Sequence, residues 1–336
     1  MGLSGLVLVL PLLGVSTFYL GLVISVMLLA IFATSFNLLY GYTGLLSFGH
    51  AAYFGISAYT LGLALSGQLD VLPSVFESFF PALLLSVVVA SVFAAIFGYF
   101  CVQRGDIYFA MLTLAFNMMV YEIVFTWNDF TGGSDGLTLI ISPMEILGIE
   151  INLLDTVTFY YVSFVGILIS FAIMWRIVNS PYGEILMAIR ENPERAELIG
   201  IHVTRYQLSS FIIAGMFAGF AGALFAVRNF IVTPDMLHWS VSAEPVLMTL
   251  LGGPGAFLGP MLGAFLFVAL EQVLSRITDY WQFGLGVVLV PIVLFAPGGV
   301  MSLLREQADI STSIDPRHYF GDTSGNQSSQ EGNKND

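Results

Sequence analysis

The 336-residue chain is too apolar for a water-soluble protein, because 57% of its residues are hydrophobic and only 10% are charged, against about 25% in ordinary soluble domains. Its formal net charge of −13 argues against a nucleic-acid partner, since nucleic-acid-binding surfaces are basic. The composition predicts an all-α polytopic membrane protein in contact with lipid. Helices are favoured over a barrel because the apolar runs are continuous rather than alternating.

Six apolar runs approach the roughly 20 residues that a membrane-spanning helix needs, at about 18–40, 80–101, 107–127, 158–178, 206–228 and 257–275. Shorter or interrupted runs lie at about 3–16, 45–65, 244–252 and 281–297. We therefore expect about eight to ten transmembrane helices, some of them short or broken. The region 244–297 holds two or three crossings, depending on whether 244–252 spans the bilayer or only dips into it.

The first long glycine-containing interruption is GYTGLLSFGH, at 41–50, which lies between two apolar runs. Its glycines do not keep to one helical stripe, and they are mixed with hydroxyl groups that can satisfy loosened backbone groups. This pattern indicates a break or a tight turn between helices, either beside a transport path or as a simple packing turn. The candidate path residues are Gly41, Tyr42, Gly44, Ser47, Phe48, Gly49 and His50.

A loop at about 179–205 is rich in arginine, whereas the loop at about 128–157 is acidic and contains no Lys or Arg. Because cationic residues in short loops stay on the cytoplasmic side, the first loop is predicted to be cytoplasmic and the second external. The cytoplasmic loop reads as two short helices, with Pro181 and Pro193 at their starts and Gly200 after the second.

The second loop helix is amphipathic, with apolar Ala196, Leu198 and Ile199. Its apolar side either binds a partner or lies on the bundle or the bilayer surface. The loop residues singled out as candidates are Glu184, Arg190, Glu191, Glu194, Arg195, Ala196, Glu197 and Gly200.

Two further glycine-rich stretches follow. GMFAGFAGALFA places Gly215, Gly219 and Gly222 at spacings of four and three, which is typical of a packing seam between membrane helices. LGGPGAFLGPMLGAF interrupts a later apolar run and suggests a second helix break, so that two breaks in different halves would flank a path. Its glycines are Gly252, Gly253, Gly255, Gly259 and Gly263.

We expect a permease domain at 1–304 and a polar, disordered tail at 305–336, because the tail is rich in Gly, Ser and Asn and poor in large apolar residues. Arg305 favours a cytoplasmic C-terminus. The single lysine, Lys334, and the acidic charge balance suit a halophilic source, since carboxylates keep proteins hydrated in high salt.

No catalytic motif is evident. A P-loop requires a lysine in G-x-x-x-x-G-K-[ST], and Lys334 lies in GNKND. The four histidines are scattered, so we predict no metal site, and G-x-S-x-G is absent. We therefore expect no enzyme activity and no cofactor in this chain, which leaves a transporter, a channel or a scaffold.

Three stretches together resemble the LivM-type permease subunits of branched-chain amino acid ABC importers, in the same order and over nearly the whole chain. They are GYTGLLSFGHAAYFGISAYT, AIRENPERAELIGI with the following YQLSSFIIAGMFAGFAGALFA, and GGPGAFLGPMLGA. The broader family includes permeases for urea, short amides and, more distantly, simple sugars. The resemblance implies transport of branched-chain amino acids, with those other small solutes as the alternative.

The resemblance also implies partners: a second, LivH-type permease, two cytoplasmic ATPase subunits that bind ATP and Mg, and an external solute-binding protein, all at the cell membrane. The segment 194–200 is similar to the coupling loop that fits a groove of the ATPase. It departs from the family pattern because Arg195 separates Glu194 from Ala196 and Glu197 follows, which leaves open which carboxylate takes the family's role.

The competing interpretation is a self-sufficient secondary transporter, which would favour intramembrane charge pairs. None is evident in the sequence, since Glu271 and Arg276 are five residues apart, too far for a good helical pair. Asn37 and Asn117 also lie within apolar runs and are predicted to form hydrogen bonds between helices.

Overall fold

The computed structural model describes residues 11, 16–68, 73–103, 105–139, 141, 144–146, 149–278, 280–295 and 298–302. The predicted segment at 3–16 lies outside them apart from residues 11 and 16. The tail at 305–336 also lies outside, so the predicted domain boundary at 304 is not described.

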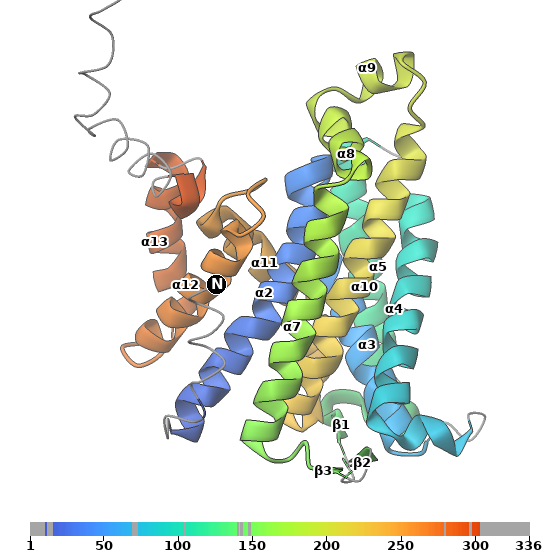
Figure 1. The fold of residues 1–336 in the computed structure, drawn as a ribbon, viewed down its shortest axis with the longest axis vertical. Helices are drawn as coiled ribbons and strands as arrows, with labels where there is room; N and C mark the ends of the chain where they lie inside the picture. The colour runs from blue at the N-terminus through green and yellow to red at the C-terminus, as the bar shows by residue number, and fades with distance from the viewer. Residues whose placement is uncertain are drawn as a thin grey trace, which may run out of the picture.

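Nine apolar helices of 14 or more residues build the described bundle (Figure 1). Five are long and apolar enough to cross a bilayer: α2 (Thr17–Thr43), α4 (Phe79–Cys101), α5 (Asp106–Thr126), α7 (Thr156–Val178) and α10 (Val203–Asn229). Four are shorter: α3 (His50–Leu65), α11 (Trp239–Gly252), α12 (Gly259–Leu274) and α13 (Trp281–Phe295). The chain is therefore an all-α polytopic membrane protein, as predicted, and the region 244–297 contains parts of three helices.

The two ends of the bundle differ (Figure 1). At one end lie α8 (Pro181–Glu191) and α9 (Pro193–Leu198), and we call it the loop end. At the other end lie β1 (Leu137–Thr138), β2 (Met144–Ile146) and β3 (Ile149–Ile151), and we call it the hairpin end. The remaining short elements are α6 (Asn128–Thr131), β4 (Ile231–Val232) and the 3-10 turns η2 (Ser74–Glu77), η3 (Gly133–Asp135) and η4 (Pro234–Leu237).

The strands form two small antiparallel ladders. β2 pairs with β3 as a hairpin, with Met144 opposite Ile151. β1 pairs with β4, with Leu137 opposite Val232. Because β4 directly follows α10, this second ladder ties the end of α10 to the segment that follows α5.

The outer helices show why this chain needs lipid. On α4 the buried residues Ala82, Ser86, Ala90 and Ala94 recur every four positions and form one narrow face. Between them the apolar side chains of Leu84, Val88, Val92 and Ile96 are about half or more exposed. An apolar outer surface of this kind is stable in a hydrocarbon solvent and not in water.

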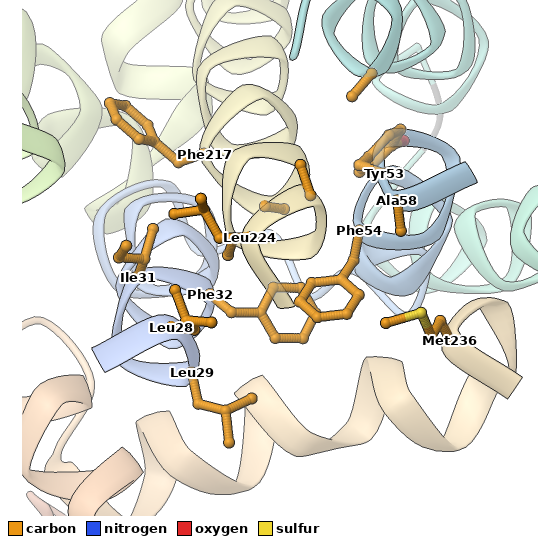
Figure 2. Close-up of a cluster of buried hydrophobic side chains, with 14 of the residues drawn as sticks. Leu28, Leu29, Ile31, Phe32, Tyr53, Phe54, Ala58, Phe217, Leu224 and Met236 are labelled. Carbon is orange, nitrogen blue, oxygen red and sulfur yellow. The ribbon is translucent and has the colours of Figure 1, made fainter. Parts of the chain in front are cut away.

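The core lies between α2, α3 and α10 (Figure 2). Phe32 of α2 and Phe54 of α3 pack with ring centroids 4.7 Å apart, and Leu224 of α10 belongs to the same cluster. Glycines allow α10 to approach its neighbours closely: a Cβ at Gly215 would lie 2.6 Å from the Ala94 Cβ, and one at Gly219 would lie 2.6 Å from the Ala90 Cβ. The seam glycines therefore lie where even a Cβ has no room, against the small side chains of Ala90 and Ala94.

Candidate functional site

Helix α8 is held firmly against the bundle at the loop end. It begins at Pro181, as the sequence predicts, and its inner side chains Leu186 and Ile189 are fully buried. The Tyr182 hydroxyl hydrogen-bonds the Ser209 hydroxyl of α10 at 2.7 Å. These contacts make α8 a rigid piece attached to α7 and α10.

Helix α9 has one buried and one exposed side. Its N-cap is Asn192, whose side-chain oxygen accepts a hydrogen bond from the Arg195 backbone N–H at 2.8 Å. Ala196 is buried near Ile189, whereas Leu198 and Ile199 are 88% and 72% exposed. The predicted partner-binding face therefore consists of Leu198 and Ile199 without Ala196, which packs inward.

Gly200 follows α9 with a φ of +91°, a conformation that favours glycine. An open hollow of about 330 Å³ lies beside it, lined by Glu197, Gly200, Ile201, His202, Val203, Thr204 and Arg205. The exposed side chains of Leu198 and Ile199 and this hollow together form a surface with both a protrusion and a recess.

Most charged candidates on the loop point into solvent. Glu184, Glu191, Glu194, Arg195 and Glu197 are exposed. Within the part of the chain that the structure describes, none of these side chains forms a hydrogen bond to another residue. They therefore form a charged surface on the loop and do not hold its fold.

GYTGLLSFGH breaks the chain between two helices, as predicted. Helix α2 ends at Thr43, and Gly44 takes a left-handed conformation with a φ of +79° that caps it. Helix α3 begins at His50, whose ring nitrogen Nε2 lies 3.3 Å from the Ser35 hydroxyl. Since Ser35 is eight residues before the end of α2, α3 starts about 12 Å below that end, at 1.5 Å per helical residue.

Hydroxyl groups satisfy the exposed backbone of this first break, again as predicted. The Phe48 N–H donates to the Thr113 hydroxyl of α5 at 3.1 Å, and the Gly49 N–H donates to the Ser47 hydroxyl at 3.2 Å. At the start of α3 the Ala51 N–H donates to the Ser242 hydroxyl of α11 at 2.9 Å. In the low dielectric of a membrane interior such groups would otherwise be costly.

The candidate path residues of this break are packed closely in the described conformation. Tyr42, Ser47 and His50 are buried, and Phe48 is half-buried. Gly49 has no room for a side chain, because a Cβ there would lie 2.6 Å from the Thr113 carbonyl oxygen. The segment is thus a packed re-entrant turn in this state, and a role in the path requires it to move.

The second break lies at 253–258, between α11 and α12. Gly253 and Gly255 have φ values of +110° and +83°. The Asn37 side chain of α2 bridges the break, since its amide donates to the Ala256 carbonyl and its oxygen accepts from the Gly255 N–H, both at 3.1 Å. Asn37 therefore bonds across elements, as predicted, but its partners lie in the break between α11 and α12 and not in a helix.

Asn117 likewise bonds between elements, because its amide donates to the Leu237 carbonyl at 2.8 Å. The prediction for this residue is also confirmed.

Arg190 joins the loop to both breaks. Its guanidinium NH1 donates a hydrogen bond to the Gly41 carbonyl in the last turn of α2. A Cβ at Gly255 would lie 3.1 Å from the same NH1, and a Cβ at Gly44 would lie 3.3 Å from the Arg190 Cγ. Three stretches that are far apart in the sequence therefore meet at one arginine. Arg190 makes a charge-assisted hydrogen bond to the first stretch and packs closely against the second break.

The structure also brings together charges that the sequence did not pair. Glu271 of α12 lies within Coulombic range of Arg228 of α10, although no salt bridge or hydrogen bond joins the two among the described residues. An ionisable residue in an apolar run is a usable signal. Its partner on another helix could not be read from the sequence.

The comparisons with known proteins agree with this architecture. Residues 18–296 match the family described as branched-chain amino acid transport system / permease component. The LivM permease protein of the high-affinity branched-chain amino acid transport system of Salmonella typhimurium is 27% identical over 307 residues, which cover 85% of this chain and 70% of that protein. Its counterpart in Escherichia coli is 27% identical over 302 residues, or 84% and 69%.

A more distant similarity covers about half of the chain. The autoinducer 2 import system permease protein LsrC of Yersinia pseudotuberculosis is 30% identical over 174 residues, which are 48% of this chain and 50% of that protein. No solved structure matches. Since the family match covers most of the sequence, including both breaks and the α8–α9 loop, the chain belongs to the branched-chain amino acid transport system permease family.

Proposed function

We propose that the chain is the membrane-spanning permease subunit of an ABC importer for branched-chain, hydrophobic amino acids. An external solute-binding protein delivers the amino acid, and a second, LivH-type permease completes the transport path in the cell membrane. The family match supports this proposal, as do the LivM proteins, whose names state branched-chain amino acid transport.

Two cytoplasmic ATPase subunits, which bind ATP and Mg, are the proposed partners of the loop end. Arg190 lies on α8, Arg195 on α9 and Arg205 in the first turn of α10, which supports a cytoplasmic position for this end. The exposed Leu198 and Ile199 offer apolar area beside the hollow at Gly200. A groove of the ATPase would bury these side chains.

The observation that carries the coupling mechanism is the hydrogen bond from Arg190 to the Gly41 carbonyl. Closure of the ATPase dimer would shift α9, and the buried anchors of α8 would transmit that shift as a rigid-body movement. Arg190 would then displace the end of α2 and the loop at Gly255 together. Both breaks would change conformation in one step, which would open 41–50 toward the path.

Two alternative functions predict different results in an uptake experiment. A related importer could carry urea, a short amide or another small polar solute, because the binding protein sets most of the selectivity. LsrC illustrates a permease in this range of similarity that belongs to the import system of another solute. The alternative from another class is a secondary transporter that works without ATP.

The first experiment is uptake of radiolabelled leucine into membrane vesicles that contain this chain with its proposed partners. We expect uptake to require ATP and to disappear in a Leu198→Asp/Ile199→Asp variant, which changes the exposed apolar side chains of the loop, with the ATPases no longer co-purifying. Uptake by the chain alone without ATP would establish the secondary transporter instead. ATP-driven uptake of urea or an amide, without leucine uptake, would keep the importer and change its substrate.

Arg190→Gln tests the coupling step. Loss of a charge-assisted hydrogen bond corresponds to about a 10- to 100-fold effect, so we expect leucine uptake to fall by that factor while the ATPases still bind and hydrolyse ATP. The matched control is Arg176→Gln. Arg176 is an exposed arginine in the last turn of α7, which leads into the same loop. Equal loss in both variants would contradict a specific role for Arg190.

A further inference from the structure

The connection between α10 and α11 crosses the bundle near the hairpin end. This segment, 230–238, contains β4 and η4, and we call it the strap. At its start, Phe230 has a φ of +56°, and it is the one residue other than glycine with a positive φ among the described residues. That conformation has an energetic cost for a residue with a Cβ. Contacts with the rest of the bundle therefore hold the strap in place against a local strain.

The strap follows one face of α3. Gly55, Tyr59 and Gly62 share this face, because residues four and three positions apart are neighbours on a helix surface. A Cβ at Gly55 would overlap the side chain of Leu237, and a Cβ at Gly62 would lie 3.5 Å from the Val232 Cγ2. Tyr59 lies between these two contacts, so the strap covers it as well.

Leu237, the last residue of η4, is fully buried and is held from two sides. Its side chain fills the notch that Gly55 leaves in α3. Its backbone carbonyl accepts a hydrogen bond from the Asn117 amide of α5 at 2.8 Å. The preceding residue, Met236, lies beside α3 in the buried cluster that contains Phe54 (Figure 2). One helix therefore binds the side chain of Leu237, and another binds its carbonyl.

Two buried polar atoms beside the strap lack partners. The Asn117 side chain is 0% exposed and Tyr59 is 4% exposed. Among the described residues, neither the Asn117 Oδ1 nor the Tyr59 hydroxyl has a hydrogen-bond partner. Because unpaired polar groups are costly inside a membrane protein, each one calls for an explanation. A ligand that brings its own polar groups would satisfy both.

The place of Leu237 lies next to the first break, on its hairpin side. Thr113, whose hydroxyl accepts from the Phe48 N–H of that break, is four residues before Asn117 on the same face of α5. The end of α5 leads to β1 at the hairpin end (Figure 1), so Asn117 is about 6 Å nearer that end than Thr113. On the proposed route, an external amino acid would reach this place before the first break.

We propose that Leu237 occupies a binding site for an α-amino acid with a branched apolar side chain, and that the strap withdraws Leu237 when the ligand enters. The ligand side chain takes the notch at Gly55. Its carboxylate replaces the Leu237 carbonyl at the Asn117 N–H donor, and its ammonium group donates to the Asn117 Oδ1. The Tyr59 hydroxyl adds a further polar contact.

The chemistry of Leu237 itself favours this site. A leucine residue carries the same side chain and the same carbonyl carbon on its Cα as free leucine, so the closed strap fills the site much as the ligand would. Free leucine differs by its charged carboxylate and ammonium, which suit the donor and the unpartnered acceptor of one amide. This inference rests on the proposed function and names the place where its substrate is bound.

The test uses the complex of this chain with the second permease and the ATPases, in lipid nanodiscs without the solute-binding protein. The thermal unfolding midpoint is followed against leucine. Because Leu237→Ala removes the competing side chain, its midpoint should rise at leucine concentrations about 10- to 100-fold lower than in the unaltered complex. Leu237→Val, a milder truncation, should show a smaller shift in the same direction. In Leu237→Ala, 3-methylbutylamine, which lacks the carboxylate, should require about 10- to 100-fold more than leucine.

Leu28→Ala is the matched control, because Leu28 of α2 is an equally buried leucine away from the strap. It should lower the ligand-free midpoint, and its leucine response should equal that of the unaltered complex. Combined with Leu237→Ala, Asn117→Asp replaces the donor with a charge that repels a carboxylate, and the leucine response should weaken about 10- to 100-fold. Tyr59→Phe in the same background should weaken it about 2- to 10-fold.

Several outcomes would overturn the site. Equal leucine responses in Leu237→Ala and Leu28→Ala would show that the strap is only a structural connection. An equal response to 3-methylbutylamine would indicate an apolar cavity without a carboxylate contact, and an unchanged response with Asn117→Asp would exclude Asn117. ATP-driven leucine uptake by the unaltered complex, without a leucine response in Leu237→Ala, overturns the site alone. Absence of uptake overturns the proposed function.

Discussion

The two helix breaks satisfy their backbone polar groups in different ways. The break at 44–49 satisfies its backbone with hydroxyl groups from its own segment, from α5 and from α11. The break at 253–258 depends on one amide side chain, Asn37, for both a donor and an acceptor. Arg190 contacts the first through a hydrogen bond and lies against the second.

This difference separates a break that is held at several points from one that is held at a single point. Three hydroxyls on three elements hold the first break, so the loss of one leaves the others in place. The second break has a single bridge beside a movable guanidinium, and one displacement can release it. We therefore expect the second break to be the less stable and the more responsive to the loop.

The largest effect should come from Asn37→Leu, which leaves the Gly255 N–H and the Ala256 carbonyl without their partner. At about 1–3 kcal/mol for each of the two unsatisfied groups, the free energy of unfolding should fall by about 2–6 kcal/mol. Equilibrium unfolding in increasing amounts of a denaturing detergent measures this free energy. Asn117→Leu removes one interhelical bond instead of two and should cost about half as much. An equal loss of unfolding free energy in Asn37→Leu and Asn117→Leu would contradict the double role of Asn37 at the second break.

Next in size are Gly44→Ala and Gly255→Ala, one in each break. Both positions have a positive φ, which costs a residue with a Cβ about 1–2 kcal/mol. The new Cβ would lie 3.1 Å from the Arg190 NH1 in Gly255→Ala and 3.3 Å from the Arg190 Cγ in Gly44→Ala. Because only the first meets the guanidinium group that donates to Gly41, Gly255→Ala should reduce ATP-driven uptake more than Gly44→Ala does, beyond its effect on thermal stability. Gly286→Ala in α13, where a Cβ has open space, should be neutral or stabilising. Uptake lost equally in both break variants would contradict the assignment of the switch.

A smaller effect is expected from Ser47→Ala and Thr113→Val in the first break. Each removes one hydroxyl acceptor and should cost about 0.5–1.5 kcal/mol, as measured from the thermal unfolding midpoint. If the hydroxyls hold the first break independently of one another, the double variant should cost about the sum of the two. A double cost well below that sum would show a single cooperative bridge, like that of Asn37.

The smallest effect is expected at the hairpin end, away from both breaks. The Asp155 carboxylate caps α7 by accepting from the Thr158 N–H at 3.0 Å and its hydroxyl at 2.9 Å, and these hydrogen bonds lower the pKa of Asp155 below 3.8. Its stabilisation is therefore complete above about pH 4 and is lost as the pH falls through the lowered value.

Asp155→Asn keeps a good cap without the charge. Its thermal unfolding midpoint between about pH 3 and pH 7 should differ from that of the unaltered protein only in the acidic part of the range. A difference that persists at neutral pH would indicate a role for the charge beyond the cap.

Much of this arrangement could be predicted from local signals. Pro181, Pro193 and Gly200 set the bounds of the loop helices, because proline favours the first helical turn and glycine the position after the last. The two breaks followed from glycine density within apolar runs. The fold class followed from the length and continuity of those runs.

The partners in space could not be predicted in the same way. Thr113 and Ser242 are 65 and 191 residues from the backbone groups they satisfy, and no period in the sequence connects them. The run at 257–275 looked like a full span, but its helix has 16 residues. The hairpin of β2 and β3 was missed because its strands have three residues each. The translocation-path residues stay a prediction.

The hydrogen bonds of Asn37 form only late in the synthesis of the chain. Its partner Gly255 lies 218 residues later, which a ribosome making about 5–20 residues per second needs roughly 10–45 s to reach. During that interval α2 carries an amide in the bilayer before its partner has been translated. A segment made late in synthesis therefore completes α2, and a nascent chain that stops before 253 never acquires the partners of Asn37.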